Sequence, residues 1–321
     1  MIRTTVVIPN YNGIKYIENC LYSLEQGSVI PKIIVVDNGS VDGSLLLIKE
    51  KFPHVQIIEF AENTGFCKAV NAGIKAASTE YVLLLNNDTV ADREMVRSLE
   101  AVLDAEPEAF SAAARMISLH DPEKLDSAGD FYCALGWAFS RGKDKPSESY
   151  MRSGRIFSAC AGAALYRREV FDRIGYFDEN HFAYLEDMDI GYRANIYGYY
   201  NKYAPDAIVY HAGSAVSGSR HNEFKVSLSS RNSVYLIYKN MPFLQIFLNL
   251  PFLVLGYLVK FLFFALKGMG GVYLKGIGKG ISLSLSARGR KNKVKFSIKN
   301  LKSYIWIQLQ LWLNLFRRVL G

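Results

Sequence analysis

The chain has 321 residues, half of them hydrophobic and 13% aromatic, and this composition excludes an intrinsically disordered or fibrous protein. A chain of this length is expected to form one large domain with a smaller appendage. The net charge of +8 is unevenly distributed: residues 1–220 carry 22 Lys and Arg against 29 Asp and Glu, whereas residues 221–321 carry 16 against one acid, Glu223. The sequence therefore predicts an acidic first part and a strongly basic second part.

The cysteines indicate a reducing compartment. Cys20, Cys67, Cys133 and Cys160 are far apart and form neither a CxxC motif nor a Cys/His ligand spacing, so we expect buried free thiols. The first residues lack the basic start and apolar run of a signal peptide, which predicts that this end of the chain stays in the cytoplasm.

Strand-like and helix-like segments alternate through the first 90 residues. Short β-branched or apolar runs predict strands at 4–8, 33–36, 55–60 and 81–85. Apolar residues at helical spacing predict helices at 14–24, 45–52 and 69–77. This alternation is typical of a parallel α/β sheet, in which ligands bind at the carboxyl ends of the strands. Because polar residues follow these strands, we expect the functional site at that edge of the sheet.

The next segment is less regular. Residues 118–158 are rich in Gly, Ser and charged side chains and are expected to form a connection across the acceptor side of the site. Regular structure is expected to return at 162–166, and a helix is expected around 168–174.

Two common nucleotide-binding motifs are absent. The sequence has no GxGxxG after its first strand and no GxxxxGK[ST], which disfavours a nicotinamide-binding Rossmann site and a P-loop. An acidic, amide-rich rim of Asp37, Asn63, Asn86 and Asp88 is expected instead. Asp37 directly follows a strand, where its carboxylate could accept hydrogen bonds from a base N–H or a ribose hydroxyl. Stabilisation of an Asx turn is the alternative role for Asp37.

Asp88 and Asn86 stand two residues apart at the end of the fourth strand, so both side chains are expected on the same face. A carboxylate in that position suits Mg²⁺ or Mn²⁺, which prefer oxygen ligands and bind jointly to substrate phosphates. Asp88 as the N-cap of a helix beginning near Asp92 is the alternative. His211 follows a strand-like segment at 207–210 and suits a metal ligand, a phosphate contact or a core histidine.

Three carboxylates fall within four residues at Glu186, Asp187 and Asp189. Their mutual repulsion is unfavourable unless a cation, a helix N-terminus or a reacting proton offsets it. The cluster predicts a general base and a second carboxylate that orients substrate. A charged first helical turn paired with Arg193 is the alternative.

Residues 243–266 are almost entirely apolar, and their number matches the ~20 residues of a membrane span. Pro251 and Lys260 weaken that interpretation. Nine Lys and Arg and no acid follow between residues 275 and 302. Clustered cations beside aromatic and leucine side chains favour peripheral or monotopic association with an anionic membrane, with a single span or a buried soluble bundle as alternatives. Nucleic-acid binding is disfavoured because no motif for it accompanies the basic residues.

A series of sequence blocks resembles family 2 glycosyltransferases of the GT-A fold, and more narrowly their bacterial rhamnosyltransferase branch. The blocks are VIPNYN at 7–12, VVDNGSVDGS at 35–44, NTGFCKAVNAG at 63–73, LNND at 85–88, the stretch 175–193 containing YLEDMDIGYR, and HAGS at 211–214. LNND stands where the family carries its DxD motif, the stretch 175–193 resembles the acceptor-side ED motif, and HAGS resembles the HxxGS element. The resemblance covers roughly residues 1–235.

The composition of residues 236–321 predicts a basic, apolar, helical membrane-associating region, and the resemblance implies a GT-A catalytic domain at 1–235, with a mixed sheet flanked by helices. The resemblance also implies that Asp187 deprotonates the acceptor hydroxyl, that Glu186 orients the acceptor, and that Asp88 binds Mg²⁺ or Mn²⁺ on the donor diphosphate with His211 as a candidate second ligand. The residues implied to hold the donor nucleotide are Pro9, Tyr11, Asn12, Asp37, Asn63, Gly65, Asn86, Asn87 and Asp88. Asn86 replaces the first Asp of the DxD motif, so one carboxylate remains there.

The implied reaction is inverting transfer of a sugar, with L-rhamnose from dTDP-rhamnose favoured, to a hydroxyl of a polyprenyl-diphosphate-linked or other glycan. The expected place is the cytoplasmic face of the cell membrane, in cell-surface polysaccharide synthesis. Transfer from a UDP-linked hexose or N-acetylhexosamine is the alternative within the family. A sugar nucleotidyltransferase is disfavoured because no Gly-rich, Lys- or Arg-bearing loop follows the first strand. A non-catalytic nucleotide-sugar-binding membrane scaffold is the alternative of another class, and the Glu186–Asp187 pair argues against it.

Overall fold

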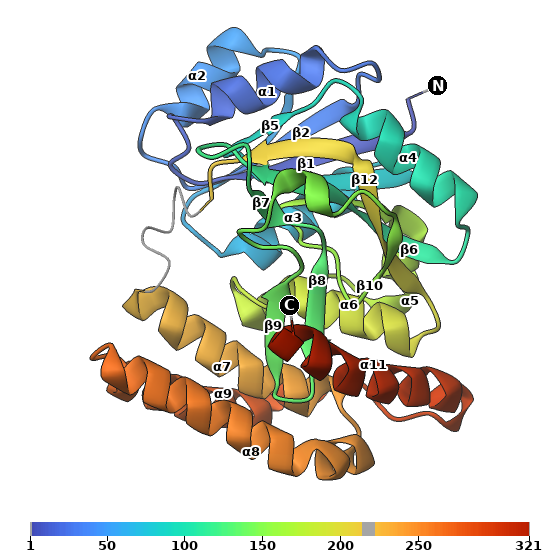
Figure 1. Ribbon diagram of the computed structural model, residues 1–321. Coiled ribbons are helices and arrows are strands. Elements are labelled where there is room, and N and C mark those ends of the chain that lie inside the picture. The colour runs from blue at the N-terminus through green and yellow to red at the C-terminus, as the bar shows by residue number, and fades with distance from the viewer. Residues whose placement is uncertain (1, 214–221, 321) are drawn as a thin grey trace.

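The structure, a computed structural model, describes residues 2–213 and 222–320. A ten-stranded sheet with its flanking helices forms one layer, and the C-terminal helices form a second layer beneath it (Figure 1).

The first half of the sheet confirms the predicted alternation of strands and helices. Its parallel strands lie in the order β3 (Gln56–Phe60), β2 (Lys32–Asn38), β1 (Thr4–Asn10) and β4 (Tyr81–Leu85). The intervening helices are α1 (Ile17–Glu25), α2 (Ser44–Lys51) and α3 (Phe66–Ala76). Val6 and Ile8 of β1 pack into the core on one face of the sheet and Val7 into the core on the other, because successive side chains of a strand alternate. Both faces are therefore buried, and polar residues are left at the strand ends.

The second half makes the sheet mixed. Strand β11 (Ala163–Arg167) lies antiparallel between β4 and β6 (Ala109–Ser118), and β12 (Tyr200–His211) runs parallel to β6. Shorter strands complete it: β5 (Thr89–Ala91) and β10 (Gly154–Ile156) pair with β12, and β7 (Leu125–Ser127) pairs with β6. The helices of this half are α4 (Met95–Ala105), α5 (Arg168–Ile174) and α6 (Glu186–Ile196). This is the mixed sheet flanked by helices that the sequence resemblance implies.

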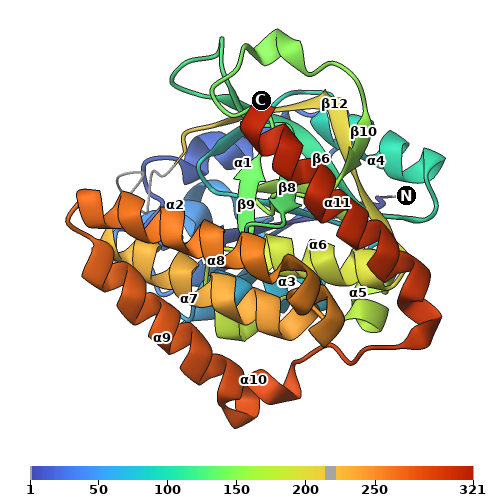
Figure 2. The same cartoon turned by 60° about the horizontal axis from the view of Figure 1, so that its bottom comes forward.

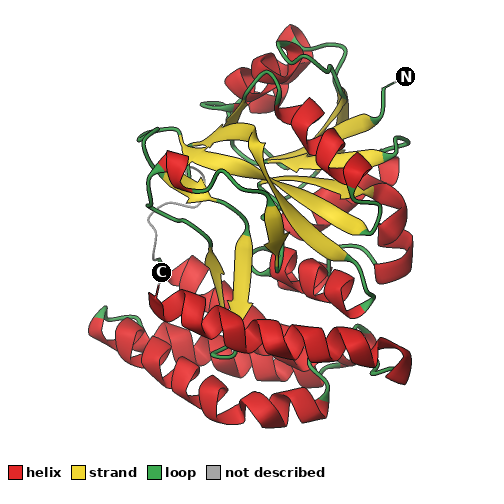
Figure 3. Cartoon of the chain, turned by 45° about the vertical axis from the view of Figure 1, so that its right-hand side comes forward, coloured by secondary structure: helices red, strands yellow, loops and turns green. Residues whose placement is uncertain are grey.

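The region 118–158 contains a hairpin that leaves the sheet. Strands β8 (Asp130–Cys133) and β9 (Trp137–Ser140) pair antiparallel and reach down to the helical layer (Figure 3). Near the tip, the backbone N–H of Ala134 donates to the carbonyl of Leu311 at 3.0 Å, and the indole N–H of Trp137 donates to the carbonyl of Gly256 at 3.1 Å. The hairpin therefore joins the sheet to the helices.

The helical layer contains closely packed helices. They are α7 (Glu223–Asn240), α8 (Phe243–Leu266), α9 (Gly270–Leu285), the short α10 (Ala287–Lys291) and α11 (Leu301–Leu320). Helices α7, α8 and α9 lie alongside one another (Figure 2), and α11 packs against β8. A Cβ atom at Gly276 would lie 1.8 Å from the Ser230 hydroxyl oxygen, so the close approach of α9 to α7 depends on glycine. The domain boundary predicted near residue 235 falls inside α7 and stays a prediction.

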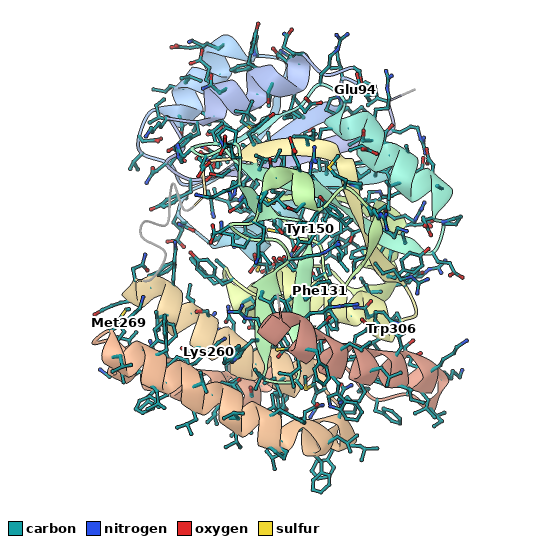
Figure 4. The ribbon with its side chains drawn as sticks, viewed as in Figure 1. Glu94, Phe131, Tyr150, Lys260, Met269 and Trp306 are labelled. Atoms are coloured by element: carbon teal, nitrogen blue, oxygen red, sulfur yellow. The ribbon has the colours of Figure 1, made fainter. Side chains whose placement is uncertain are left out.

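Helix α8 places polar residues inward and apolar residues outward. Its inward, buried or half-buried side chains recur at a spacing of three or four: Gln245, Asn249, Leu253, Gly256, Lys260 and Phe264. Asn249 exchanges hydrogen bonds with Gln308 of α11 at 2.8 and 2.9 Å. Other side chains of α8 project away from the sheet (Figure 4), and only 17% of its most apolar stretch is buried. A helix on a water-exposed surface has the reverse arrangement.

Candidate functional site

A cavity of about 1090 Å³ extends from the strand ends of the sheet to the helical layer. Its walls come from the ends of β1, β2 and β4, the loop before α6, the β8–β9 hairpin, and helices α7, α8 and α9. The predicted site residues that line it are Pro9, Tyr11, Asn63, Gly65, Asn86, Asn87, Asp88, Glu186, Asp187 and His211. The structure therefore brings together the two halves of the predicted site, one from the sheet edge and one from α6.

Asn12 and Asp37 do not line the cavity, and their hydrogen bonds hold together the turns that follow β1 and β2. The Asp37 carboxylate is 1% exposed and accepts hydrogen bonds from Asn10 Nδ2 at 2.9 Å and from the Ser40 N–H at 3.0 Å. Asn12 has a φ of 50°, and its Oδ1 accepts a hydrogen bond from the Val41 N–H at 2.9 Å. The turn-stabilising alternative for Asp37 is thus present in the structure. Contact of these two side chains with a donor nucleotide stays a prediction.

The loop containing Asn63 and Gly65 connects the sheet-edge end of the cavity to the loop before α6. Asn63 Oδ1 accepts hydrogen bonds from Asn38 Nδ2 at 3.1 Å and from the Gly65 N–H at 3.0 Å. Gly65 has a φ of +90°, and a Cβ atom there would lie 2.5 Å from the ring of Phe182. Glycine is therefore needed both for the backbone conformation and for the approach of this ring, which also lines the cavity.

Asp88, His211 and Asp126 form a line of hydrogen-bonded groups at the sheet edge. Pairing of β12 with β5 places His211 opposite Thr89 and so beside Asp88. Asp88 Oδ1 is 3.2 Å from His211 Nε2, and Asp126 Oδ2 is 2.8 Å from His211 Nδ1. Burial disfavours the charged imidazole, but the hydrogen bonds to Asp126 and Asp88 raise the pKa of His211 to about 9.

The structure excludes the N-cap alternative for Asp88 and does not describe the last residue of the HAGS block. Asp88 is not the N-cap of the next helix, because α4 begins at Met95 and Glu94 occupies its cap position. Ser214, the last residue of the HAGS block, lies outside the described residues.

The residues at this edge fit a divalent metal ion. The carboxylate of Asp88 and the imidazole of His211 converge in the cavity, and both are ligands that Mn²⁺ accepts. Asp126 accepts a hydrogen bond from the Nδ1–H and so orients the ring, and a metal ion would bind Nε2 in place of the proton that this nitrogen shares with Asp88. Mg²⁺ and Mn²⁺ bind through few protein ligands together with substrate phosphates and water, which suits a rim with Asn86 in place of a carboxylate.

A second group of candidate ligands lies beside the predicted catalytic residues. The carboxylate oxygens of Asp130 and Asp187 and the Cys160 sulfur all lie within 4.8 Å of one another. All four cysteines are free, as predicted, and burial holds the pKa of the Cys160 thiol well above its usual value. A protonated thiol is a poor ligand for hard ions such as Mg²⁺, so Asp88 and His211 form the better metal site.

Glu186 and Asp187 begin α6 and line the cavity. Burial raises the pKa of Asp187 to about 6. Burial and the charge of Asp187 also raise the pKa of Glu186, whose Oε2 has no hydrogen-bond partner among the described residues. Asp187 Oδ1 accepts a hydrogen bond from the Met188 N–H at 2.6 Å. A carboxylate with a pKa close to neutrality that lines a cavity is suited to accept a proton from a bound hydroxyl.

Asp189 does not line the cavity and belongs to a buried ion-pair network. Its carboxylate lies 3.0 Å from Arg193 Nη2 and 2.8 Å from Lys239 Nζ, and Lys239 also lies 2.8 Å from Asp178. Burial opposes ionisation, but Lys239 and Arg193 hold the pKa of Asp189 below its usual range. Asp189, in the first turn of the helix, therefore pairs with Arg193, which was the alternative stated for the acidic cluster. Through Lys239 the same network also joins α6 to α7.

Sequence reasoning missed Asp126 and Asp130. Asp130 lines the cavity, accepts a hydrogen bond from Ser140 Oγ at 2.8 Å, and has a pKa raised by burial and by the charge of Asp187. Both aspartates lie in the segment expected to be a connection, and their spacing of four residues around Ser-Ala-Gly was the only local signal. Their positions depend on strand pairing with distant parts of the chain, which no local pattern reveals.

Comparisons with known proteins agree with this geometry. The sequence profile described as "Glycosyl transferase family 2" matches residues 5–175. The chain is 26% identical to the N-acetylglucosaminyl-diphospho-decaprenol L-rhamnosyltransferase of Mycobacterium tuberculosis, with 71% of this chain and 84% of that protein covered. It is 27% identical to the rhamnosyltransferase WbbL of Escherichia coli K12, with 62% of this chain and 80% of that protein covered.

A solved structure shares the fold. The mannosyltransferase PcManGT from Pyrobaculum calidifontis, in complex with GDP-Man and Mn²⁺, matches 96% of this chain and 87% of its own at 17% identity and a TM-score of 0.55. This similarity confirms the predicted GT-A architecture.

Proposed function

The chain belongs to glycosyltransferase family 2, and on that premise we propose that it moves L-rhamnose from dTDP-rhamnose to a hydroxyl of a lipid-linked glycan in cell-surface polysaccharide synthesis. As a member of this family it is an inverting transferase that uses a nucleotide-sugar donor. The names of its relatives in M. tuberculosis and E. coli support rhamnose as the sugar, and the first name also supports a polyprenyl-diphosphate-linked acceptor. The observation that carries the proposal is one cavity lined by both the Asp88–His211 pair and the Glu186–Asp187 pair.

In the proposed reaction, the Asp187 carboxylate accepts the proton of the acceptor hydroxyl while the hydroxyl oxygen attacks the anomeric carbon of the donor sugar. The bond from that carbon to the diphosphate oxygen breaks, and its electron pair leaves with the nucleoside diphosphate. A single displacement inverts the anomeric centre. Glu186 orients the acceptor, because its unpartnered oxygen can accept a hydrogen bond from a second hydroxyl.

The donor side of the cavity holds the leaving group. Asp88 and His211 would hold a divalent ion, whose positive charge would stabilise the departing diphosphate. Asn87 donates through Nδ2 to Asn10 Oδ1 at 2.8 Å, which fixes the end of β4 against the turn that follows β1. The diphosphate position is therefore tied to the strand ends rather than to a mobile side chain.

We also propose that the helical layer binds the cytoplasmic face of the cell membrane. The outward side chains of α8 are exposed and apolar, and residues 221–321 carry 16 cations against one acid. Each basic residue near an anionic surface contributes about 1 kcal/mol of attraction. A full span is disfavoured because it would break the Asn249–Gln308 pair and the hydrogen bond from Trp137 to Gly256. A monotopic arrangement keeps these contacts and buries the outward face in the interface.

The test is a thermal-shift panel of dTDP-rhamnose, UDP-glucose, UDP-galactose, UDP-GlcNAc and GDP-mannose, each with Mn²⁺ and with EDTA. We expect the largest Mn²⁺-dependent shift with dTDP-rhamnose. A larger shift with a UDP-sugar supports the alternative donor. Binding of a donor without transfer to any lipid-linked acceptor supports the scaffold, and the absence of any shift contradicts the proposed donor site.

A further inference from the structure

Lys260 lies on the inward face of α8, where the cavity reaches the helical layer (Figure 4). Its ammonium group is 5.5 Å from the centroid of the Trp137 ring. Within the described ranges, it has neither a hydrogen-bond partner nor an ion-pair partner. A half-buried cation without a carboxylate is unfavourable by itself, and a bound anion would stabilise it.

Arg318 of α11 adds a second positive charge at the same hairpin. Its guanidinium carbon lies 5.6 Å from the centroid of the Phe139 ring. Phe139 and Trp137 stand two residues apart in β9, so their side chains lie on the same face of the strand. The charges of Lys260 and Arg318 act on each other, and neither is paired with a carboxylate among the residues described. Two cations without an acid favour a multiply charged anion.

The β8–β9 hairpin extends from Lys260 to the carboxylates around the proposed base. Trp137 begins β9 and Ser140 ends it, and three residues of extended strand span roughly 10 Å. Ser140 donates to Asp130, whose carboxylate lies within 4.8 Å of the carboxylate of Asp187. Lys260 therefore adjoins the tip of the hairpin and Asp187 lies near its opposite end, and both residues line the same cavity. Serines of α7 line the wall of the same cavity, at Ser229, Ser230 and Ser233.

We propose that Lys260, with the charge of Arg318 nearby, binds the diphosphate of an acceptor in which a sugar is joined through that diphosphate to a lipid. This inference rests on the proposed function and adds to it the residue that recognises the diphosphate of the acceptor. The acceptor hydroxyl meets Asp187, the diphosphate meets Lys260, and the lipid chain leaves along the exposed face of α8. On that face Leu258, Leu262 and Phe263 are 50%, 52% and 42% exposed.

Binding of farnesyl diphosphate tests the site without requiring the correct sugar. The donor site is first saturated with Mn²⁺ and a nucleoside diphosphate chosen from the donor panel, so that the probe cannot occupy it. Tryptophan fluorescence reports binding because Trp137 adjoins Lys260. We expect Lys260→Gln to weaken binding by about 10- to 100-fold. Lys260→Arg should retain most of the affinity, since the charge is kept.

The matched control is Lys32→Gln, because Lys32 is an exposed lysine at the amino end of β2, opposite the strand ends that line the cavity. It removes the same charge and should bind the probe like the wild type. Equal affinity in the wild type and in Lys260→Gln overturns the inference. So does binding of farnesol as tight as that of farnesyl diphosphate, which would indicate an apolar site alone.

A kinetic experiment separates this inference from the proposed function. N-acetylglucosamine, the sugar named for the mycobacterial relative, is offered in detergent micelles as a short-chain lipid diphosphate and as an alkyl glycoside. Lys260→Gln should raise KM for the diphosphate acceptor by about 10- to 100-fold, with little change in kcat or in the rate with the alkyl glycoside. An equal loss with both acceptors overturns the diphosphate site. If the wild type transfers sugar from no donor, the result counts against the proposed function. Binding of farnesyl diphosphate then tests by itself whether Lys260 forms an anion site.

Discussion

The substitution Asp187→Asn removes the proposed base while keeping its shape. The amide cannot accept the hydroxyl proton, and loss of a positioned general base lowers a rate by about 10²- to 10⁴-fold. Donor binding should persist, because Asp88 and His211 belong to the sheet edge and Asp187 belongs to α6. Transfer assays at saturating donor, together with the donor-induced thermal shift, measure the two effects separately. A loss of donor binding would contradict the assignment of Asp187 as the base.

The same substitution should stabilise the folded protein at neutral pH. Burial raises the pKa of Asp187 from its usual 3.8 to about 6, so at pH 7 the folded state carries a charge that its surroundings disfavour. About two pKa units correspond to about 3 kcal/mol. This shift already includes the hydrogen bond from the Met188 N–H at the start of α6, which lowers the pKa. We expect Asp187→Asn to raise the free energy of unfolding by about 3 kcal/mol.

The stability that Asp187→Asn gains over the wild type should increase as the pH rises. Near pH 4 the folded state of the wild type holds the Asp187 proton and the unfolded state holds about half of it, so the two proteins should differ little. As the pH rises through about 6, the unfolded state loses its proton first, and the wild type loses stability relative to the variant. Urea denaturation at about pH 4 and about pH 7.5 measures the difference. The argument that burial disfavours this carboxylate would be refuted if the variant were less stable than the wild type at the higher pH. It would also be refuted if the two proteins differed in free energy of unfolding by the same amount at both pH values.

Four further substitutions test other parts of the structure. Asp88→Ala should abolish the Mn²⁺-dependent part of the donor-induced thermal shift, and an unchanged dependence would locate the metal elsewhere. Asp126→Asn should weaken Mn²⁺ affinity by about 10- to 100-fold in calorimetric titration, because the group that orients the imidazole is lost, and equal affinity would argue against that role. Gly276→Leu should lower the free energy of unfolding by about 3 kcal/mol, whereas Gly278→Leu, with no atom within 4 Å of its Cβ position, should not; similar values for both would rule out the tight α7–α9 contact. Leu258→Glu should reduce co-sedimentation with anionic vesicles without lowering Tm, and undiminished binding would remove α8 from the membrane contact.

The local features of this protein could be predicted from its sequence. The strands β1 to β4 and the helices between them follow from apolar periodicity, because burial on both faces of the sheet requires continuous apolar runs. Asp88 comes three residues after the end of such a run, and its place at the ligand-binding edge follows from the topology of parallel sheets. The cluster of carboxylates at 186–189 predicts a special environment there, and the structure places Asp187 on the wall of the cavity, whereas its role as the base stays a prediction.

Contacts between distant segments were decided only by the tertiary structure. Asp187 and Asp189 stand two residues apart, yet one lines the cavity and the other pairs with Lys239, fifty residues further along the chain. Asp126 and Asp130 acquire their roles through the pairing of β7 with β6 and through the β8–β9 hairpin. The inward direction of Lys260 likewise depends on what packs against α8. Periodicity specifies which side chains avoid water, whereas the partner of each charge depends on how separate segments pack together.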